Sequence, residues 1–152
     1  MKNTTLCYLE RDGAYLMLHR IKKENDENRD KWIGVGGKFE VGESPFDCAR
    51  REVLEETGLS VNALKYRGIV TFVSDEYGTE YMHLFTSTEF TGDIKIECDE
   101  GTLEWVKKEK IPHLNLWEGD KIFLELLKSE ARFFSLKLIY SGENLVSHTL
   151  EI

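Results

Sequence analysis

The chain has 152 residues, of which 41% are hydrophobic and 32% are charged, and its formal net charge is −8. This length and balance predict one compact domain over residues 1–152 and exclude intrinsic disorder. Because the charge surplus is negative, we expect no nucleic-acid polymer as a partner. A small phosphate-bearing ligand stays compatible with this charge if a cation mediates its binding.

The cysteines and the apolar runs indicate the compartment. Cys7, Cys48 and Cys98 lie far apart and form no CxxC pair, so we expect neither a disulfide framework nor a zinc knuckle. The start of the sequence lacks the apolar stretch of a signal peptide. No apolar run approaches the roughly 20 residues that span a bilayer. We therefore expect a cytoplasmic protein with no membrane partner.

The first predicted elements are two strands at residues 4–10 and 14–20, joined by a turn at Arg11-Asp12-Gly13. The polar stretch 22–31 is typical of a solvated loop. A glycine-dense segment, WIGVGG at residues 32–37, follows it. This segment predicts an irregular backbone that other groups can approach closely.

A helix is predicted to begin sharply after this loop. Ser44 suits the N-cap, Pro45 the first helical position, and Asp47 the acidic position of a capping box. Gly58 suits the residue that follows the last turn. The helix is therefore expected to occupy the residues between Ser44 and Gly58.

The second half of the chain predicts more strands and one more helix. Strands are expected at 69–74, 80–90, 102–106, 132–140 and 144–151, and a helix at 118–129. Trp105 lies in an apolar strand and is expected in the core. Many strands with two helices predict a mixed α/β fold with the helices packed on the sheet faces.

The helix after Ser44 carries two different faces. An apolar stripe recurs at i, i+3 and i+7 and predicts core contact: Phe46, Ala49 and Val53. On another face, Glu52 meets Glu55 at i+3 and Glu56 at i+4, a spacing at which like charges destabilise a helix. One interpretation is a solvated acidic face relieved by arginines within the helix. The other is a site for a cation.

The surroundings of these glutamates favour the cation site. The glycine-rich loop and a further acid, Glu43, lie shortly before these glutamates in the sequence. Clustered carboxylates are ligands for hard divalent cations, and Mg²⁺ bridges such ligands to substrate phosphates. The cation would neutralise both the carboxylates and a phosphate held against the loop backbone.

The spacing from Gly37 through Glu43 to Arg51-Glu52-Val53-Leu54-Glu55-Glu56-Thr57-Gly58-Leu59 resembles the complete box of the Nudix family, G-x5-E-x7-R-E-U-x-E-E-x-G-U, where U is a bulky aliphatic residue. The resemblance implies a Nudix α/β/α sandwich with a mixed sheet. It also implies Mg²⁺-dependent cleavage, with Mn²⁺ as an alternative ion, of a nucleoside diphosphate linked to another group.

Three further segments resemble the MutT-like branch that hydrolyses oxidised purine nucleotides: residues 31–38, 116–120 and 133–152. Two positions depart from the animal enzymes of that branch. Ile33 replaces an asparagine, and Gly119 replaces the first of two aspartates, so only Asp120 of that polar set remains. Because isoleucine cannot hydrogen-bond a base edge, discrimination of an oxidised guanine must differ here or be weaker.

The resemblance also implies roles for individual residues. Glu55 and Glu52 are implied as catalytic, with Arg51 orienting Glu55, and the general base among the glutamates stays open. The implied metal ligands are Gly36, through its carbonyl, Glu52, Glu55, Glu56 and Glu100. The implied substrate-binding residues are Trp32, Ile33, Gly37, Lys38, Trp117 and Asp120. Four of these have a plain structural alternative: Glu100 as an exposed turn acid, Trp32 as an anchor of the loop, Trp117 as a core aromatic residue and Asp120 as a first-turn helix acid.

The implied activity is hydrolysis of a nucleoside triphosphate such as 8-oxo-dGTP to the monophosphate and pyrophosphate, which sanitises the nucleotide pool and supports DNA repair. Alternatives are a dinucleoside polyphosphate, weakly indicated by Tyr77, ADP-ribose, or a non-catalytic nucleotide sensor. A sensor would be expected to have lost the glutamates, and all are present. The chain is expected to be a monomer or a homodimer.

Overall fold

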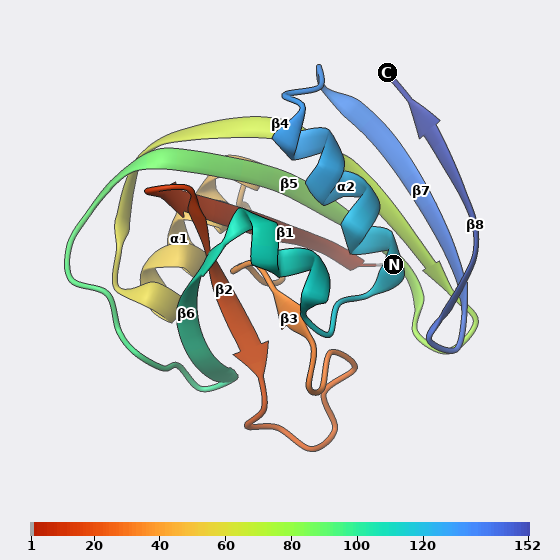
Figure 1. Ribbon diagram of the computed structural model, residues 1–152, viewed down its shortest axis with the longest axis horizontal. Helices are drawn as coiled ribbons and strands as arrows, with labels where there is room; N and C mark the ends of the chain where they lie inside the picture. The colour runs from red at the N-terminus through yellow and green to blue at the C-terminus, as the bar shows by residue number, and fades with distance from the viewer. Residues whose placement is uncertain (1) are drawn as a thin grey trace.

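The computed structural model describes residues 2–152, and Figure 1 shows the arrangement of its elements. The strands are β1 (Lys2–Arg11), β2 (Ala14–Arg20), β3 (Trp32–Ile33), β4 (Ser60–Ser74), β5 (Gly78–Thr91), β6 (Gly101–Lys107), β7 (Phe134–Ser141) and β8 (Asn144–Glu151). The helices are α1 (Pro45–Thr57), α2 (Glu118–Lys128) and a short 3₁₀ helix, η1 (Lys108–His113). Within the described residues, no helix is long and apolar enough to cross a membrane.

The strands form a mixed sheet in the order β3-β2-β1-β5-β4-β7-β8, and β6 pairs with β2. β1 runs parallel to β5 and β4 runs parallel to β7, whereas the other pairs are antiparallel. Such parallel pairs need long crossover connections, which here contain α1 and α2. The sheet therefore brings β1, near the start of the chain, beside a strand that begins at Gly78.

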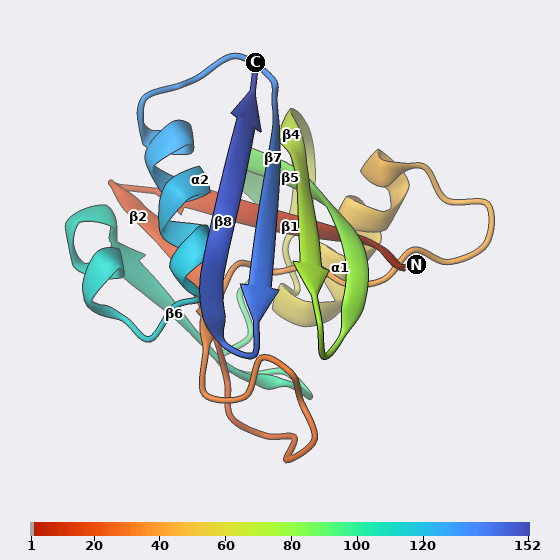
Figure 2. The same cartoon turned by 90° about the vertical axis from the view of Figure 1, so that its right-hand side faces the viewer.

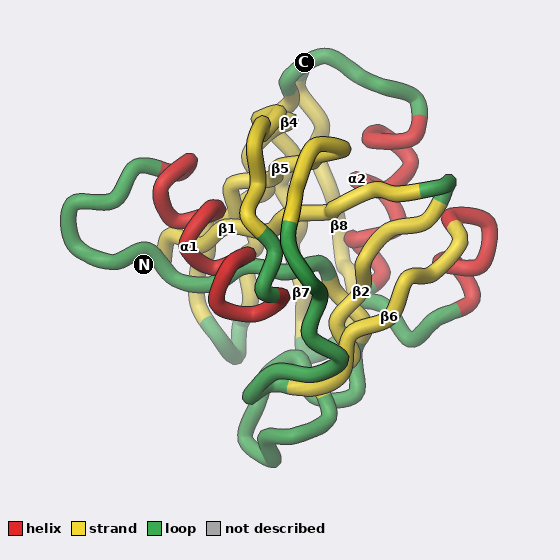
Figure 3. Tube along the Cα trace, turned by 90° about the vertical axis from the view of Figure 1, so that its left-hand side faces the viewer, coloured by secondary structure: helices red, strands yellow, loops and turns green. Residues whose placement is uncertain are grey.

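The two faces of β1 pack against different helices. Leu6 and Tyr8 lie in one buried cluster with Phe123 of α2, whereas Cys7 lies in a second cluster with Ala49 of α1. This alternation follows from the two-residue period of a strand. The helices consequently cover opposite faces of the sheet, as the views in Figures 2 and 3 show. The expected α/β/α sandwich is confirmed.

Helix α1 has the predicted ends. The Asp47 backbone N–H donates to Ser44 Oγ at 3.1 Å, and the Ser44 backbone N–H donates back to the Asp47 carboxylate at 3.0 Å. Gly58 ends the helix at φ +80°, a conformation that glycine adopts without strain. Ala49 and Val53 of the apolar stripe are fully buried. The helix that carries the acids is thus fixed at both ends and along one face.

Several expected boundaries were wrong. β4 begins at Ser60 instead of residue 69, because its irregular first half pairs with the end of β5 across register shifts. β3 and η1 were missed, since each is short and β3 exists only through pairing with β2.

Trp105, which was expected in the core, is only partly buried. It stacks on Phe90, and the Arg11 guanidinium lies over its ring.

The glycine-dense loop is held against β1 by backbone hydrogen bonds. The Thr5 N–H donates to the Gly37 carbonyl at 2.9 Å, and the Cys7 N–H donates to the Val35 carbonyl. The loop therefore runs alongside β1, between that strand and α1. This placement brings the loop backbone to the acidic face of the helix.

Candidate active site

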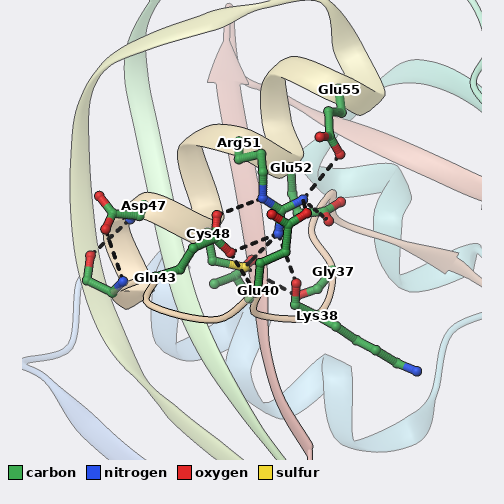
Figure 4. A network of polar contacts seen from close by, with 11 residues as sticks. Gly37, Lys38, Glu40, Glu43, Asp47, Cys48, Arg51, Glu52 and Glu55 are labelled. Atoms are coloured by element: carbon green, nitrogen blue, oxygen red, sulfur yellow. Dashed lines mark hydrogen bonds and ion pairs between the residues drawn. The ribbon is translucent and has the colours of Figure 1, made fainter.

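Arg51 joins the loop to the acids of α1, as Figure 4 shows. Its guanidinium donates to both carboxylate oxygens of Glu43, at 2.7 and 2.9 Å, and to the Lys38 carbonyl at 3.0 Å. It also donates to Glu52 at 2.8 Å and to Glu55 at 3.2 Å. Its side chain therefore orients both implied catalytic glutamates, whereas the sequence suggested only Glu55.

Glu43 is the strongest partner of this arginine. The hydrogen bonds from Arg51 lower the pKa of the Glu43 carboxyl to about 2. A carboxylate that accepts a bidentate arginine hydrogen bond stays ionised and fixes the plane of the guanidinium. Glu43 thus serves as the anchor of the network, and the other glutamates remain available for further contacts.

Two glycines allow the loop to approach the helix closely. A Cβ atom on Gly37 would lie 2.5 Å from the Glu52 carboxyl carbon, and one on Gly36 would lie 1.9 Å from the Thr5 carbonyl oxygen. No side chain fits at such distances. The Gly36 N–H donates to Glu56 Oε1 at 2.9 Å. Glycine at position 37 is therefore required for the close approach to Glu52, and glycine at position 36 is required for the packing of the loop on β1.

The box glutamates differ in exposure. The Glu56 side chain lies almost entirely inside the protein, and burial raises its pKa to about 8, with a further contribution from the charges of Glu52 and Glu100. Burial also raises the pKa of Glu52, and Arg51 opposes that shift. The Glu55 side chain is 57% exposed. Within the cluster, Glu56 is therefore the buried acid beside the loop, and Glu55 is the accessible acid at the surface.

Glu100 reaches this cluster from the segment before β6. A carboxylate oxygen of Glu100, one of Glu56 and the Cys98 sulfur all lie within 4.8 Å of one another. Glu100 also hydrogen-bonds to the Cys98 thiol, and the Lys23 ammonium lies 3.5 Å from it. The sequence analysis expected Glu100 to lie beside the acids of α1, and the structure places it there. The position of Cys98 beside them was not expected.

The donor set suits a divalent cation. Glu56 Oε2 is buried and has no hydrogen-bond partner within residues 2–152. An ionised, unpaired oxygen in such a position is costly unless a cation meets it. Carboxylate oxygens from Glu52, Glu56 and Glu100, with the nearby loop backbone, are the donor type that Mg²⁺ takes.

A pocket of about 180 Å³ adjoins the cluster through the loop. Six of the residues predicted to contact substrate or metal line it: Ile33, Gly36, Gly37, Lys38, Trp117 and Asp120. β1 and β5 form the opposite wall, with Thr4 and Glu80. Because Gly36 contacts Glu56 and also lines the pocket, the acids and the pocket form one continuous site.

Asp120 lies at the buried end of this pocket. It is 3% exposed, and burial raises the pKa of its carboxyl to about 8, although Lys31 partly opposes the shift. The carboxyl is therefore neutral at pH 7 and carries one O–H donor and one free acceptor. Its burial exceeds what a first-turn helix acid requires, which favours the pocket interpretation over the plain structural one.

A second polar group of the pocket, Glu80, was not identified from sequence. Glu80 Oε2 accepts a 2.7 Å hydrogen bond from Thr4 Oγ1, and the Lys2 ammonium lies 3.4 Å from Glu80 Oε1. The charge of Glu80 contributes to the raised pKa of Asp120. Only the parallel pairing of β1 with β5 brings Thr4 beside this strand, so no local spacing could have revealed the contact.

Trp117 is both a core residue and a wall of the pocket. It is 5% exposed, and its ring packs edge-on against Phe72 and Tyr140. Its indole N–H donates to Asn28 Oδ1 at 2.9 Å. Asn28 belongs to the stretch 22–31, which is a largely exposed loop as predicted, but Asn28 itself is partly buried by this contact. The loop is held against the pocket because the buried indole N–H needs an acceptor.

Trp32 fits its structural alternative, an anchor of the loop, and the structure explains why position 119 is glycine. Trp32 is not among the residues that line the pocket: its ring stacks on His19, 4.3 Å between centroids, and its backbone N–H donates to the Asn115 carbonyl. Gly119 is glycine because Tyr140 and Leu138 fill its surroundings. A Cβ atom there would lie 2.4 Å from Leu138 Cδ1, and the Tyr140 hydroxyl already accepts the Gly119 N–H at 2.7 Å.

The family model of the NUDIX domain matches residues 2–127. The chain is 35% identical to an oxidized purine nucleoside triphosphate hydrolase from Danio rerio, over 99% of this chain and 94% of that protein. It is 30% identical to the Nudix hydrolase YvcI from Bacillus subtilis, over 99% and 95% of the two chains. Its fold is similar to that of a MutT protein from Bacillus halodurans, with a TM-score of 0.89, 28% identity and coverage of 99% and 98%.

The chain belongs to the Nudix family and is a hydrolase of that family. The resemblance to the Nudix family that the box suggested is confirmed, and so is the resemblance to MutT-like proteins that three further segments suggested. Nudix hydrolases act on nucleotide substrates and generally use a divalent metal ion, which agrees with a carboxylate cluster beside a pocket.

Proposed function

We propose that this enzyme hydrolyses oxidised purine nucleoside triphosphates, such as 8-oxo-dGTP, to the monophosphate and pyrophosphate. The observation that carries the proposal is the continuity of the site: Gly36 hydrogen-bonds to Glu56 of the acidic cluster and lines the pocket that contains Asp120. A nucleotide can place its phosphates at the acidic cluster and its base in the pocket. The 35% identity to a protein that carries this activity in its name supports the assignment.

The metal would be Mg²⁺, with Mn²⁺ as an alternative, held by Glu52, Glu56 and Glu100. The buried, unpartnered Glu56 Oε2 is the feature of this chain that fits such an ion. The Gly36 carbonyl and Glu55 complete the proposed set. When bound, Mg²⁺ supplies positive charge for the phosphates and makes water at the site more acidic.

The side chains of this protein would perform the remaining work. Glu55 is exposed and Glu52 lies deeper, so either can accept a proton from the attacking water. Arg51 is a positioning residue, because its donors are engaged by Glu43 and by these glutamates. Lys38 lines the pocket and would supply positive charge to the substrate, whereas the Arg20 guanidinium, which also lines the pocket, is paired with Asp26.

Base recognition would depend on Asp120 and Glu80. A neutral Asp120 can donate to one base atom and accept from another, while the carboxyl oxygens of Glu80, which already accept from Thr4 and lie beside Lys2, offer acceptors. Trp117 closes the pocket, and Ile33 offers an apolar contact without a hydrogen bond. Such a pocket prefers a base that presents donors on two edges, and guanine oxidised at C8 has an additional ring N–H donor.

The cellular role would be sanitising of the nucleotide pool in the cytoplasm, which prevents incorporation of damaged bases and so supports DNA repair. The whole chain would act as one domain on a small-molecule substrate, without a nucleic-acid or membrane partner, as a monomer or a homodimer. The alternative substrate class, dinucleoside polyphosphates, gains no contact here: Tyr77 lies in the β4–β5 turn, 40% exposed, and does not line the pocket.

A substrate panel tests the proposal. The purified chain is incubated with 8-oxo-dGTP, dGTP, the other dNTPs, ADP-ribose and dinucleoside polyphosphates in Mg²⁺, and the products are separated and identified. The expected result is the highest kcat/KM for the oxidised purine triphosphate, with pyrophosphate as product. A higher kcat/KM for ADP-ribose or a dinucleoside polyphosphate would contradict it, as would the absence of turnover on every nucleotide.

A further inference from the structure

Cys98 is a sulfur ligand at the edge of a site otherwise made of oxygen. Its Sγ lies 3.5 Å from Glu100 Oε2, and a carboxylate oxygen of Glu56 completes a group whose atoms lie within 4.8 Å of one another. The side chain is only partly buried. The thiol is therefore open to a ligand that arrives from solvent and reaches the same acids.

A tight turn holds the sulfur in this position. The Cys98 N–H donates to the Gly101 carbonyl at 2.9 Å, and Glu97 forms an isolated bridge with Thr102 at the start of β6. A Cβ atom on Gly101 would lie 1.8 Å from the His19 carbonyl oxygen, so the turn packs tightly on β2. The sulfur and the Glu100 carboxylate thus project from one rigid turn toward Glu56.

The distance between Cys98 and Glu100 matches that of two ligands on a single thiophilic ion. Zinc binds sulfur at about 2.3 Å and carboxylate oxygen at about 2.0–2.2 Å, so a sulfur and an oxygen on one tetrahedral zinc lie about 3.6 Å apart. The observed Cys98–Glu100 separation is 3.5 Å. The third member, Glu56, contributes an independent observation: its side chain is 5% exposed and its Oε2 has no partner within the described residues.

We propose that Cys98, Glu56 and Glu100 form a binding site for a thiophilic divalent ion of the Zn²⁺ or Cd²⁺ class. Binding breaks the S–H bond of Cys98, releases the proton to solvent and forms a sulfur–metal bond, with no change of oxidation state. Mg²⁺ prefers oxygen and gains nothing from the thiol, so Cys98 distinguishes the two kinds of ion. Glu56 and Glu100 belong both to this site and to the proposed Mg²⁺ site, so a thiophilic ion competes with Mg²⁺ for them. Only this competition rests on the proposed function.

The test measures the sulfur–metal bond directly. The full-length chain is titrated with Cd²⁺ while the ultraviolet charge-transfer absorption of a sulfur–cadmium bond is recorded. The wild-type chain is expected to show this band with saturation at one ion per chain. Cys98→Ser is expected to lose it, and Cys48→Ser, which removes a thiol outside the three-ligand group, is expected to keep it. Circular dichroism and thermal melting establish that each variant is folded.

A second variant separates the carboxylates from the thiol. Glu100→Gln keeps Cys98 and removes one charged ligand, so zinc affinity, measured by competition with a chromophoric chelator, should fall by about tenfold or more. A band that persists in Cys98→Ser, or a wild-type chain without a band, would overturn the proposal. Neither result concerns nucleotide turnover in Mg²⁺, so a failure here is distinguishable from a failure of the proposed function.

Discussion

The Gly36 N–H donates to Glu56 Oε1 at 2.9 Å, while the other oxygen of the same carboxylate has no partner within residues 2–152. Half of the carboxylate is therefore fixed by the loop and half is available to a cation. This relationship explains why the loop and the helix have to approach so closely, and why glycine stands at the contact. Burial raises the pKa of Glu56 because it disfavours the charged form, and the hydrogen bond from Gly36 partly opposes this shift.

Glu55→Gln and Glu52→Gln should each lower kcat by about 10²–10⁴-fold, the scale for loss of a positioned acid–base group. Neither substitution changes the apolar stripe or the caps of α1, so the melting temperature should change little. Steady-state hydrolysis in Mg²⁺ measures the effect. Wild-type rates in both variants, or full activity of the wild-type enzyme in excess chelator, would remove the mechanism.

Folding should not require the metal, but stabilisation by Mg²⁺ should grow with pH. Glu56 has a folded pKa of about 8, above its ordinary value of 4.5, so in the metal-free protein its contribution to stability is lost as pH rises between these values. Mg²⁺ binds the ionised form. The rise in melting temperature on adding Mg²⁺ should therefore be larger at about pH 8.5 than at about pH 6. A chain unfolded in chelator would contradict this.

Asp120→Asn should remove a pH dependence of base recognition. Asp120 has a pKa of about 8, so the wild-type carboxyl is neutral below that pH and loses its donor above it. The KM of the wild-type enzyme should rise as pH passes about 8, whereas the KM of the variant should not follow this change.

Asp120→Ala should reduce the ratio of kcat/KM for 8-oxo-dGTP over dGTP. An unchanged ratio in Asp120→Ala would place Asp120 outside base recognition.

Glu80→Gln should weaken binding of guanine-type triphosphates. The variant keeps the shape of the side chain and its contact with Thr4, but it removes the charge that an N–H donor of the base would meet. The expected cost is about 1–3 kcal/mol in kcat/KM, since a hydrogen bond to a charged group is lost. Glu76→Gln, in the β4–β5 turn, is the matched control and should bind as the wild type does. Equal KM values for Glu80→Gln and wild type would exclude a contact with the base.

Gly119→Asp should not restore the paired aspartates of the animal enzymes. The added side chain would meet Leu138 and the Tyr140 hydroxyl at distances shorter than van der Waals contact. The variant should therefore be less stable by about 1–3 kcal/mol or more, the usual cost of overpacking, without improved selectivity. Chemical denaturation and the substrate ratio measure the two effects. A stable variant with higher selectivity would show that the pocket can rearrange around Tyr140.

The sequence by itself determined one half of the candidate site, the acidic face of α1. The caps at Ser44 and Gly58, the apolar stripe and the acidic face all lie within one helix, where a period of 3.6 residues fixes which side chains share a face. The caps therefore predicted the helix, the apolar stripe predicted the face that meets the core, and the box spacing predicted the acids beside the loop. Within that local segment, sequence distance and spatial distance carry the same information.

Tertiary structure alone decided the other half. Glu80 meets Thr4 through a parallel strand pair, Asn28 meets Trp117 across 89 positions, and Cys98 reaches Glu56 from the turn before β6. Gly119 is explained only by Tyr140, from a strand that follows the helix. Such contacts depend on how strands that are far apart in sequence pair and twist, and no local period encodes them. The acidic face thus depends on one helix, whereas the lining of the pocket depends on strand pairing across the sheet.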